Sequence, residues 1–399
     1  MNVHLMKVAI SAGEASGDEH AAALIAAMKS INASCVFRGM GGTQLKAGGL
    51  EVVVDASTDA GLMGFFPVLA SLRRIHNSLQ AMRRMLKEWA PDLLILVDYP
   101  DFNLRLARQA KQLGIPTFYY IPPKMWAWRA SRIKQFHRFI DRTALIFPFE
   151  KSFFKSHQYA NAFYVGHPFA SQFTDPPANH AAKAAFCLAH GINPDSHIVA
   201  ILPGSRSAEV KKLLPLSLEA LKLLNARVPN VVGVIAVADS ISAEWINSQV
   251  PPQSPVVVVK GATKDVLKNA RVGLLKSGTS NLQAAFLHLP FVMYYQASAL
   301  SAFIAKRLVS LKEYSPVNII RPGTVPELLQ KEVNPRRIAD ELAKILSSVT
   351  LQKEMIQGLQ EVQNCLMAFD EHALFKGTNS AAERAARLAI DLVKKPTQA

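Results

Sequence analysis

The sequence is poor in cysteine and has no long apolar run. Its 399 residues include three cysteines, Cys35, Cys187 and Cys365, which form no CxxC pair. This excludes a disulfide framework and a cysteine zinc site, and it fits a reducing cytoplasm. No stretch approaches the roughly 18 consecutive apolar residues that would cross a bilayer. Glu14 and Asp18 come too early for a signal peptide. We therefore expect a cytoplasmic protein whose contact with a membrane would be peripheral.

Two common nucleotide-binding motifs are missing. No GxxxxGK followed by Ser or Thr occurs, which disfavours a P-loop NTPase, and no GxGxxG occurs, which disfavours a dehydrogenase. The histidines show no ligand spacing, and Asp98 and Asp101 are three residues apart, unlike a metal-binding DxD. We therefore predict no metal and no other cofactor.

Acidic residues are few relative to basic ones. The chain has 30 Asp and Glu against 45 Lys and Arg, a net charge of +15, while half of its residues are hydrophobic, as in globular proteins. This surplus favours an anionic partner: nucleic acid, an acidic substrate or a membrane surface. No nucleic-acid recognition module accompanies the basic residues, so we expect no nucleic-acid partner.

Short apolar segments alternate with helical patterns along the chain. KVAIS, DLLILV and TALIFPF are each followed by a loop and a helical stretch, which predicts buried parallel strands and the α/β class. A Pro-rich polar stretch begins at Ala170, and the strand–loop–helix layout restarts after Asp195. We expect two Rossmann-like domains facing a cleft, residues 1–170 and 195–335. C-terminal helices follow over 336–399, and their packing back onto the first domain is left open.

Two loops in the second half have the layout of an anion site. LPGSRSAEV follows a strand and opens a helix, so the helix N–H groups, Ser205 and Arg206 are suited to a diphosphate. KSGTSNLQAA repeats this layout with Gly278 and Thr279, and Gln283 lies one turn further on, where it could reach a ribose diol. Either loop alone is equally well an ordinary turn. Together, at strand ends, they favour a nucleoside diphosphate.

Acidic residues follow two predicted strands in the first half. Asp98 and Asp101 lie in VDYPDFN, and Glu14 lies in AGEASGD. A carboxylate at a strand end can act as a general base toward a substrate hydroxyl, and we favour this role for Asp98. The alternative is a helix cap, which we favour for Asp101, before a helix beginning at Asn103. His167, in a VGHPF turn, is as well explained by a structural hydrogen bond as by a ligand contact.

One stretch has the composition of a lipid contact. GLMGFFPVLASL is strongly apolar and is followed by basic residues. The residues that we assign to membrane or acyl contact are Leu62, Met63, Phe65, Phe66 and Arg73. A second stretch, WAW at residues 126–128, is surrounded by Lys124, Arg129, Arg132, Lys134, Arg138 and Arg142. Such stretches suit RNA equally well, and a core helix with a solvated basic face is the simplest alternative for the first.

Taken together, these motifs resemble those of the lipid A disaccharide synthase family, whose members are two-domain GT-B glycosyltransferases. The matching segments are SAGEASGD, RGMGG, LMGFFPVL, DYPDFN, MWAWR, FPFE, YVGHP, LPGSRSAEV, SGT, AKRLV, VNII and VPELLQ. Each is weak alone, but their order and spacing run through most of the chain. The resemblance implies an inverting transfer of 2,3-diacylglucosamine from UDP to the 6-hydroxyl of 2,3-diacylglucosamine 1-phosphate. The products would be the β-1,6-linked disaccharide 1-phosphate and UDP.

The resemblance also implies roles for single residues. Ser205 and Arg206 match the PGSR segment and would bind the diphosphate of UDP, as would the Gly278–Thr279 turn. Asn318 matches the Asn of an LPN segment and would also belong to the substrate site. Asp98 matches the first Asp of the family's D-x-PDFN motif and would be the base, with Glu14 the second candidate.

The partners implied are the UDP-linked donor, the phosphorylated acceptor and the anionic inner-membrane surface, on whose cytoplasmic face the protein would lie. A homodimer is left open.

Three departures from the family pattern concern the expected site. Gln283 stands where the family usually has Glu, Pro122 and Lys124 replace two serines, and the LPN segment is PVN, beginning at Pro316. These changes leave two alternatives open. One is a catalytically weak relative that binds nucleotide or lipid without turnover. The other is a different UDP-sugar enzyme, such as a 2-epimerase.

Overall fold

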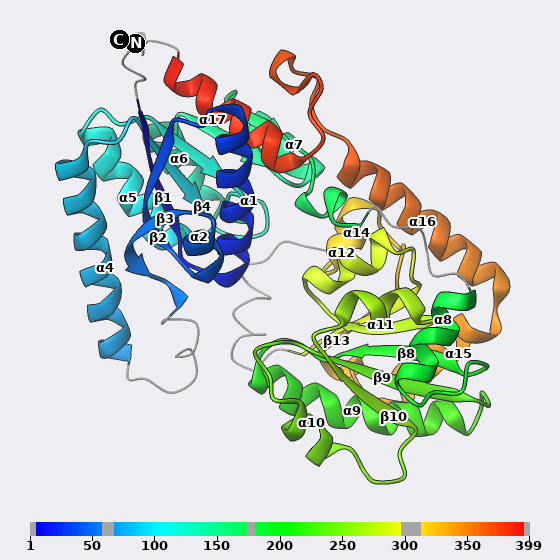
Figure 1. Ribbon diagram of the computed structural model, residues 1–399. Coiled ribbons are helices and arrows are strands. Elements are labelled where there is room, and N and C mark those ends of the chain that lie inside the picture. The colour runs from blue at the N-terminus through cyan, green and yellow to red at the C-terminus, as the bar shows by residue number, and fades with distance from the viewer. Residues whose placement is uncertain (1–4, 58–67, 174–179, 297–312, 395–399) are drawn as a thin grey trace. The chain divides into compact units, whose positions relative to one another are not determined.

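The chain folds into two compact units, each built on one parallel sheet. The structure is a computed structural model that describes residues 5–57, 68–173, 180–296 and 313–394. Unit 1 comprises Met1–Ser171 and Leu366–Ala399, and unit 2 comprises Gln172–Cys365 (Figure 1). Two sheets with flanking helices confirm the predicted α/β class.

Seven strands form the sheet of unit 1. They are β1 (Met6–Ala12), β2 (Cys35–Gly41), β3 (Leu50–Asp55), β4 (Leu93–Val97), β5 (Thr117–Tyr120), β6 (Arg142–Leu145) and β7 (Ala162–Tyr164). All neighbours pair in parallel, in the order β3-β2-β1-β4-β5-β6-β7. Every side chain of β4 and β5 is buried, which explains why these strands appear in the sequence as continuous apolar runs.

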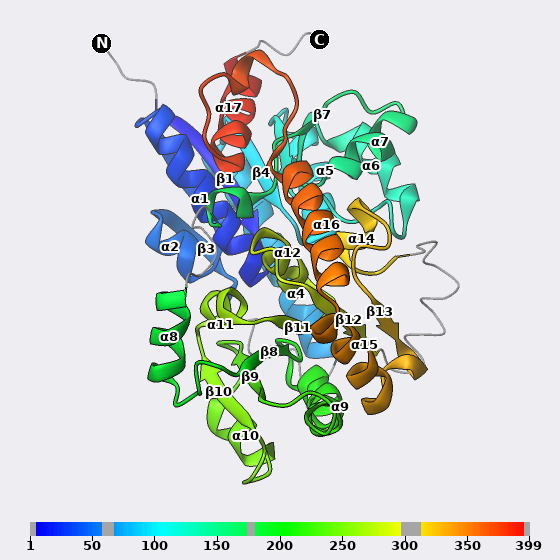
Figure 2. The same ribbon diagram turned by 90° about the vertical axis from the view of Figure 1, so that its right-hand side faces the viewer.

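Helices cover both faces of this sheet. They are α1 (Ala15–Ile31), α2 (Thr43–Ala47), α4 (Val68–Trp89), α5 (Pro100–Gln112), α6 (Ile133–Phe139), α7 (Pro148–Ser156) and α17 (Ala381–Lys394), with short 3-10 turns at Ala130–Arg132, Pro168–Ser171 and Ala373–Phe375. The helix α17 packs on α1 (Figure 2). The helices α4, α5 and α6 pack in series with one another.

Unit 2 repeats the arrangement with six strands. They are β8 (His197–Leu202), β9 (Val231–Val237), β10 (Val256–Lys260), β11 (Val272–Lys276), β12 (Phe291–Tyr295) and β13 (Glu327–Leu329), paired in parallel in the order β10-β9-β8-β11-β12-β13. The helices are α8 (His180–Ala189), α9 (Ser207–Asn225), α10 (Ala243–Gln249), α11 (Thr263–Asn269), α12 (Thr279–Phe286), α14 (Pro316–Ile320), α15 (Pro335–Ser347) and α16 (Val349–Met367), with a 3-10 turn at Gln330–Glu332. The helices α9 and α15 pack together, and α11 contacts α8 and α12.

The C-terminal helices divide between the two units. The helix α15 packs on α9, β11 and β12 in unit 2, and α16 belongs to that unit up to Cys365. The last helix, α17, contacts α1 and β6 in unit 1. The stretch 336–399 is therefore not one C-terminal element, because only its end returns to the unit that the N-terminus begins.

Candidate functional site

Each sheet has one point at which its strand order reverses. In unit 1 the sequence-first strand β1 lies beside β4, and in unit 2 β8 lies beside β11. In open parallel sheets the loops after two such strands diverge to opposite faces and leave a crevice where ligands bind. The loops at these two points carry Glu14 and Asp98 in unit 1, and Ser205 and Gly278 in unit 2. Candidate residues of both units therefore lie where the topology favours a ligand.

The Asp98 backbone is held in an unusual conformation directly after β4. Asp98 has φ +47° and Tyr99 has φ +43°, so two consecutive non-glycine residues are left-handed. The carbonyl oxygen of Asp98 accepts hydrogen bonds from the Tyr119 hydroxyl at 2.6 Å and from Asn103 Nδ2 at 2.7 Å. Such strained turns persist only where surrounding bonds fix them, and they cluster at functional sites.

Asn103 joins the two strands of the reversal point. Its Oδ1 accepts a hydrogen bond from Ser11 Oγ in β1 at 2.6 Å, and its Nδ2 donates to the carbonyl oxygens of Ser11 and Val97, at 3.3 and 3.2 Å. Asn103 is fully buried, so these bonds replace water for a polar group that would otherwise be costly to bury. The Asp98 turn is thereby tied to β1, which precedes Glu14.

The carboxyl of Asp98 lies in a partly buried, electrostatically crowded place. Its pKa is raised from 3.8 to about 6, mainly by burial and also by the negative charge of Glu14, while the Tyr99 N–H and the Lys124 ammonium oppose the shift. Glycine at position 13 leaves room for the neighbouring Tyr99 side chain, because a Cβ at Gly13 would lie 2.3 Å from the Tyr99 ring. A carboxylate with a pKa near neutrality is suited to accept a proton from a hydroxyl.

Other acidic residues of unit 1 have structural roles. Asp101 does not cap a helix that begins at Asn103: α5 begins at Pro100, and the Asp101 carboxylate pairs with Arg132 and, at 3.5 Å, with Arg129. That expectation was wrong because the left-handed turn starts the helix earlier than the sequence suggests. Asp18 is buried and accepts backbone hydrogen bonds at the start of α2.

His167 is a buried structural residue. Its Nδ1 accepts the Phe169 N–H at 3.2 Å, and its ring packs on Phe147 and Phe169. Burial lowers its pKa to about 3, with the nearby His20 adding to the effect, so the imidazole is neutral. Of the two interpretations of this histidine, the structure supports the hydrogen bond within a turn.

In unit 2 the two predicted anion loops line one cavity of about 380 Å³. Its lining includes Ser205, Arg206, Gly278, Thr279 and Gln283, all of which the sequence assigned to a substrate site. The loops precede α9 and α12, so the first N–H groups of two helices lie at this cavity. A volume of this size is within the usual range for small-molecule sites.

Two charged residues of this cavity were missed in the sequence. Lys276 ends β11 and forms an ion pair with Glu209 of α9, with 2.9 Å between Nζ and Oε1. The other oxygen of Glu209 is buried and has no hydrogen-bond partner among the described residues. Gly204, with φ +129°, accommodates this carboxylate, because a Cβ there would lie 2.6 Å from it. A lysine at a strand end beside a Gly–Thr turn is a signal that could have identified Lys276.

Asn318 lies outside the lining of this cavity. Its Nδ2 donates to Val325 O and to Glu327 Oε1, both at 2.9 Å, and its Oδ1 accepts the Val325 N–H at 3.0 Å. Glu327 of β13 also accepts the N–H groups of Tyr314 and Ser315. The Asn318 side chain and the Glu327 carboxylate together therefore hold the start of α14 against β13. These bonds position the segment around Asn318, and the contact with substrate expected for Asn318 stays a prediction.

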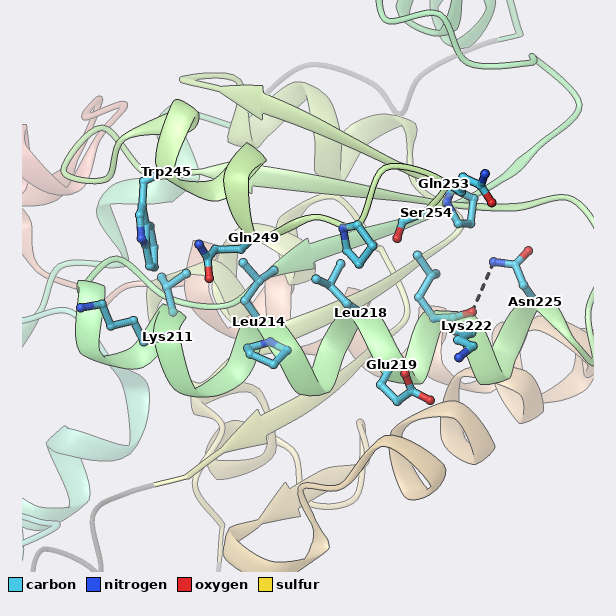
Figure 3. A pocket seen from close by; sticks show the side chains of 15 residues that line it. Lys211, Leu214, Leu218, Glu219, Lys222, Asn225, Trp245, Gln249, Gln253 and Ser254 are labelled. Carbon is cyan, nitrogen blue, oxygen red and sulfur yellow. Dashed lines mark hydrogen bonds between the residues drawn. The ribbon is translucent and has the colours of Figure 1, made fainter.

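A larger cavity, of about 620 Å³, lies elsewhere on unit 2 (Figure 3). It runs along α9 beside α10, with Leu214 and Leu218 on its wall and Trp245 and Gln253 toward its ends. None of the residues assigned from the sequence lines it. Its polar groups do not converge on one point, whereas the smaller cavity combines two helix N-termini with convergent charged and hydroxyl side chains. We therefore place the candidate nucleotide site in the smaller one.

The expected lipid contact is largely outside the described residues. Leu62, Met63, Phe65 and Phe66 lie there, while Arg73 is exposed on α4. Within the ranges that the structure describes, no helix is long and apolar enough to cross a membrane. Those same ranges contain no cluster of three or more His, Cys, Asp or Glu side chains arranged to hold a metal ion.

Comparisons with known sequences give one consistent family. The family model described as lipid-A-disaccharide synthetase matches residues 8–372. A lipid-A-disaccharide synthase from Syntrophus aciditrophicus (strain SB) is 37% identical over 391 residues, covering 97% of this chain and 98% of that protein. One from Myxococcus xanthus (strain DK1622) is 36% identical over 389 residues, covering 97% of both.

Solved structures with a similar fold are more distant in sequence. The calicheamicin glycosyltransferase covers 99% of this chain and all of its own, with a TM-score of 0.61 at 14% identity. A UDP-GlcNAc 2-epimerase from Neisseria meningitidis, bound to UDP-GlcNAc, covers 90% of this chain and 97% of its own, with a TM-score of 0.61 at 12% identity. At such identities the likeness shows only the two-domain GT-B fold.

Proposed function

Because this chain belongs to the lipid-A-disaccharide synthetase family, we propose that it transfers 2,3-diacylglucosamine from UDP to the 6-hydroxyl of 2,3-diacylglucosamine 1-phosphate. It is a glycosyltransferase of lipid A biosynthesis. The products of the proposed reaction are the β-1,6-linked disaccharide 1-phosphate and UDP.

We assign the donor to unit 2. The diphosphate of UDP would bind at the N-termini of α9 and α12, with Ser205, Arg206 and the Gly278–Thr279 turn around it and Gln283 at the ribose. Helix N-termini and an arginine fork favour an anion whose negative charge increases as the bond to the sugar breaks. The convergence of both loops on one cavity supports this assignment.

We assign the acceptor to unit 1, with Asp98 as the base. In a single displacement, the acceptor oxygen forms the new bond to the anomeric carbon while the bond from that carbon to UDP breaks. Asp98 takes the proton of the acceptor hydroxyl, and UDP leaves with the electron pair. The raised pKa of Asp98, about 6, and its place at the strand-order reversal support the choice. Glu14 is the second candidate.

The observation that carries the proposal is the family match together with a carboxylate and an anion cavity at the two reversal points. The test is formation of disaccharide 1-phosphate in detergent micelles containing EDTA, by wild type, Asp98→Ala and Glu14→Ala. Product lost only in Asp98→Ala supports Asp98 as base, and product lost only in Glu14→Ala assigns the base to Glu14. No product from the wild type, with UDP still bound, would overturn the proposed reaction.

We also propose that the protein acts while bound to the cytoplasmic face of the inner membrane. The net charge of +15 and the exposed Arg73 and Arg74 on α4 favour anionic lipid. Flotation with vesicles of phosphatidylglycerol and of phosphatidylcholine tests this. Binding to the first that weakens with salt supports the proposal, and equal binding to both contradicts the electrostatic part of it.

A further inference from the structure

The connection between β5 and α6 carries exposed cations in unit 1. Residues 124–138 include five Lys and Arg and no Asp or Glu. Arg132 is buried and paired with Asp101, which gives it a structural role. Lys124 and Arg129 are exposed. This segment follows β5, the neighbour of β4, so it lies at the sheet edge at which Asp98 lies.

The loop that presents these cations has a defined backbone. Ile121 and Arg129 have φ of +61° and +57°, a conformation that non-glycine residues adopt only where the fold requires it. The Lys124 carbonyl accepts the Ala127 N–H at 3.1 Å, and the Met125 side chain between them is buried. The two cations are therefore attached to a fixed turn.

Arg129 is oriented by an aromatic ring. Its guanidinium lies 4.5 Å from the centroid of the Trp128 ring, and Trp128 is 41% exposed. The second contact of Arg129 is with Asp101 at 3.5 Å, where both side chains are more than half exposed, so water weakens that pair. Stacking leaves the N–H fork of an arginine available for an anion.

Lys124 lies close enough to the proposed base for its charge to act on it. Burial raises the pKa of Asp98 and of Glu150, and the Lys124 ammonium opposes both shifts. Neither carboxylate forms an ion pair with Lys124, and no such pair of Lys124 is found in the described parts of the chain. Lys124 is exposed and follows the strand beside β4, so its ammonium is accessible to an external anion at the edge of the sheet where Asp98 lies.

We propose that Lys124, with Arg129 beside it, binds the phosphate group of the acceptor. This inference rests on the proposed function. The reacting hydroxyl and the phosphate belong to one sugar ring, so a cation that binds the phosphate must lie about one ring away from the base. Lys124 lies in the loop after β5, beside the strand that ends at Asp98, and it would also separate the phosphate from the negative charges of Asp98 and Glu14. The phosphate would thereby hold the acceptor with its hydroxyl toward Asp98.

The experiment compares two acceptors, 2,3-diacylglucosamine with and without the 1-phosphate. Wild type, Lys124→Met, Lys124→Arg and Arg129→Met are assayed with each, in uncharged detergent micelles at pH 8, where Asp98 is ionised even if its pKa has risen. Lys134→Met is the matched control, because Lys134 is an exposed lysine of the same segment on α6.

For Lys124→Met we expect KM for the phosphorylated acceptor to rise about 10- to 100-fold, the loss typical of one charge-assisted hydrogen bond. Its KM for the donor and its kcat/KM with the dephosphorylated acceptor should match the wild type. Lys124→Arg should retain most of the preference for the phosphate, and Arg129→Met should lose part of it. Lys134→Met should behave as wild type.

Three results would overturn the inference. Equal losses with both acceptors would mean that Lys124 acts on Asp98 rather than on the phosphate. An unchanged KM would exclude the contact. An effect that appears only when phosphatidylglycerol is added would assign the lysine to the lipid surface. If the wild type makes no product, the proposed function fails. Binding of the phosphorylated acceptor to wild type and Lys124→Met, measured by thermophoresis, then decides this inference separately.

Discussion

Lys276 Nζ lies 2.9 Å from Glu209 Oε1 inside the cavity that the two helix-opening loops of unit 2 enclose. Lys276 ends β11 and Glu209 lies in the first turn of α9, so the pair joins the loops of the strand-order reversal. Both side chains are about four-fifths buried, at 21% and 20% exposure. A carboxylate facing an anion site is tolerable only while a cation neutralises it, so we expect the pair to determine how well the cavity would accept a diphosphate.

Lys276→Met should weaken UDP binding about 30-fold or more, since breaking a buried charge pair costs roughly 2–5 kcal/mol. The change removes a cation and leaves the Glu209 carboxylate uncompensated beside the diphosphate. Isothermal titration with UDP measures the effect. In the double variant Lys276→Met, Glu209→Gln, much of the affinity should return. A double variant no better than Lys276→Met would show that the lysine acts on UDP directly, without Glu209.

Arg206→Ala should weaken UDP binding about 10- to 100-fold, because the exposed guanidinium at the start of α9 would lose its bonds to the diphosphate. Arg206→Lys should recover only part, since an ammonium lacks the planar fork. Lys222→Met is the control: it removes an exposed cation of the same helix that lines the larger cavity of Figure 3. Equal losses for Arg206→Ala and Lys222→Met would place the nucleotide elsewhere.

The activity should depend on the ionisation of Asp98. With a pKa of about 6, the carboxylate is the active form above that pH, so kcat/KM should fall as the pH drops through 6. Removing the charge of Glu14, which raises this pKa, should move the acidic limb of the profile to lower pH. The pH dependence of kcat/KM for wild type and Glu14→Gln measures this. If the acidic limb of the kcat/KM profile is absent in Glu14→Gln, the group whose ionisation controls the activity is Glu14 and not Asp98.

Much of the site could be predicted from the sequence, because position along a parallel strand fixes position in the fold. The anion loops follow the apolar runs that became β8 and β11, and the carboxyl ends of neighbouring parallel strands meet at one edge. Ser205, Arg206 and Thr279 therefore converge on one cavity as expected. The same reasoning placed Asp98 at the end of a buried strand.

Contacts between distant side chains could not be predicted in this way. The pairing of Lys276 with Glu209 depends on the packing of β11 beside β8, and the sequence gives no direct signal of it. A motif match identified Asn318 but not its partners, which are Val325 and Glu327. The roles of such residues depend on which polar atoms are buried together, and that is decided by tertiary packing.

Glu150→Gln should stabilise the protein at high pH. Glu150 is buried at the start of α7, where its Oε2 accepts the N–H groups of Ile146 and Phe147 at 3.3 and 3.2 Å. Burial raises its pKa from the ordinary 4.5 to about 7, although these N–H groups oppose the shift. The folded state therefore binds a proton that the unfolded state releases between these values. The resulting stabilisation is complete below pH 4.5 and is lost as the pH rises through 7.

Gln can accept the same two N–H bonds but carries no charge at any pH. The difference in unfolding free energy between Glu150→Gln and wild type should therefore grow between pH 5 and pH 8, by on the order of 3 kcal/mol. Urea unfolding at both pH values measures it, with Glu88→Gln, an exposed glutamate on α4, as the control. If the difference stays constant with pH, Glu150 is ionised throughout. The charge of Lys124 and the two N–H groups would then outweigh burial at this carboxyl.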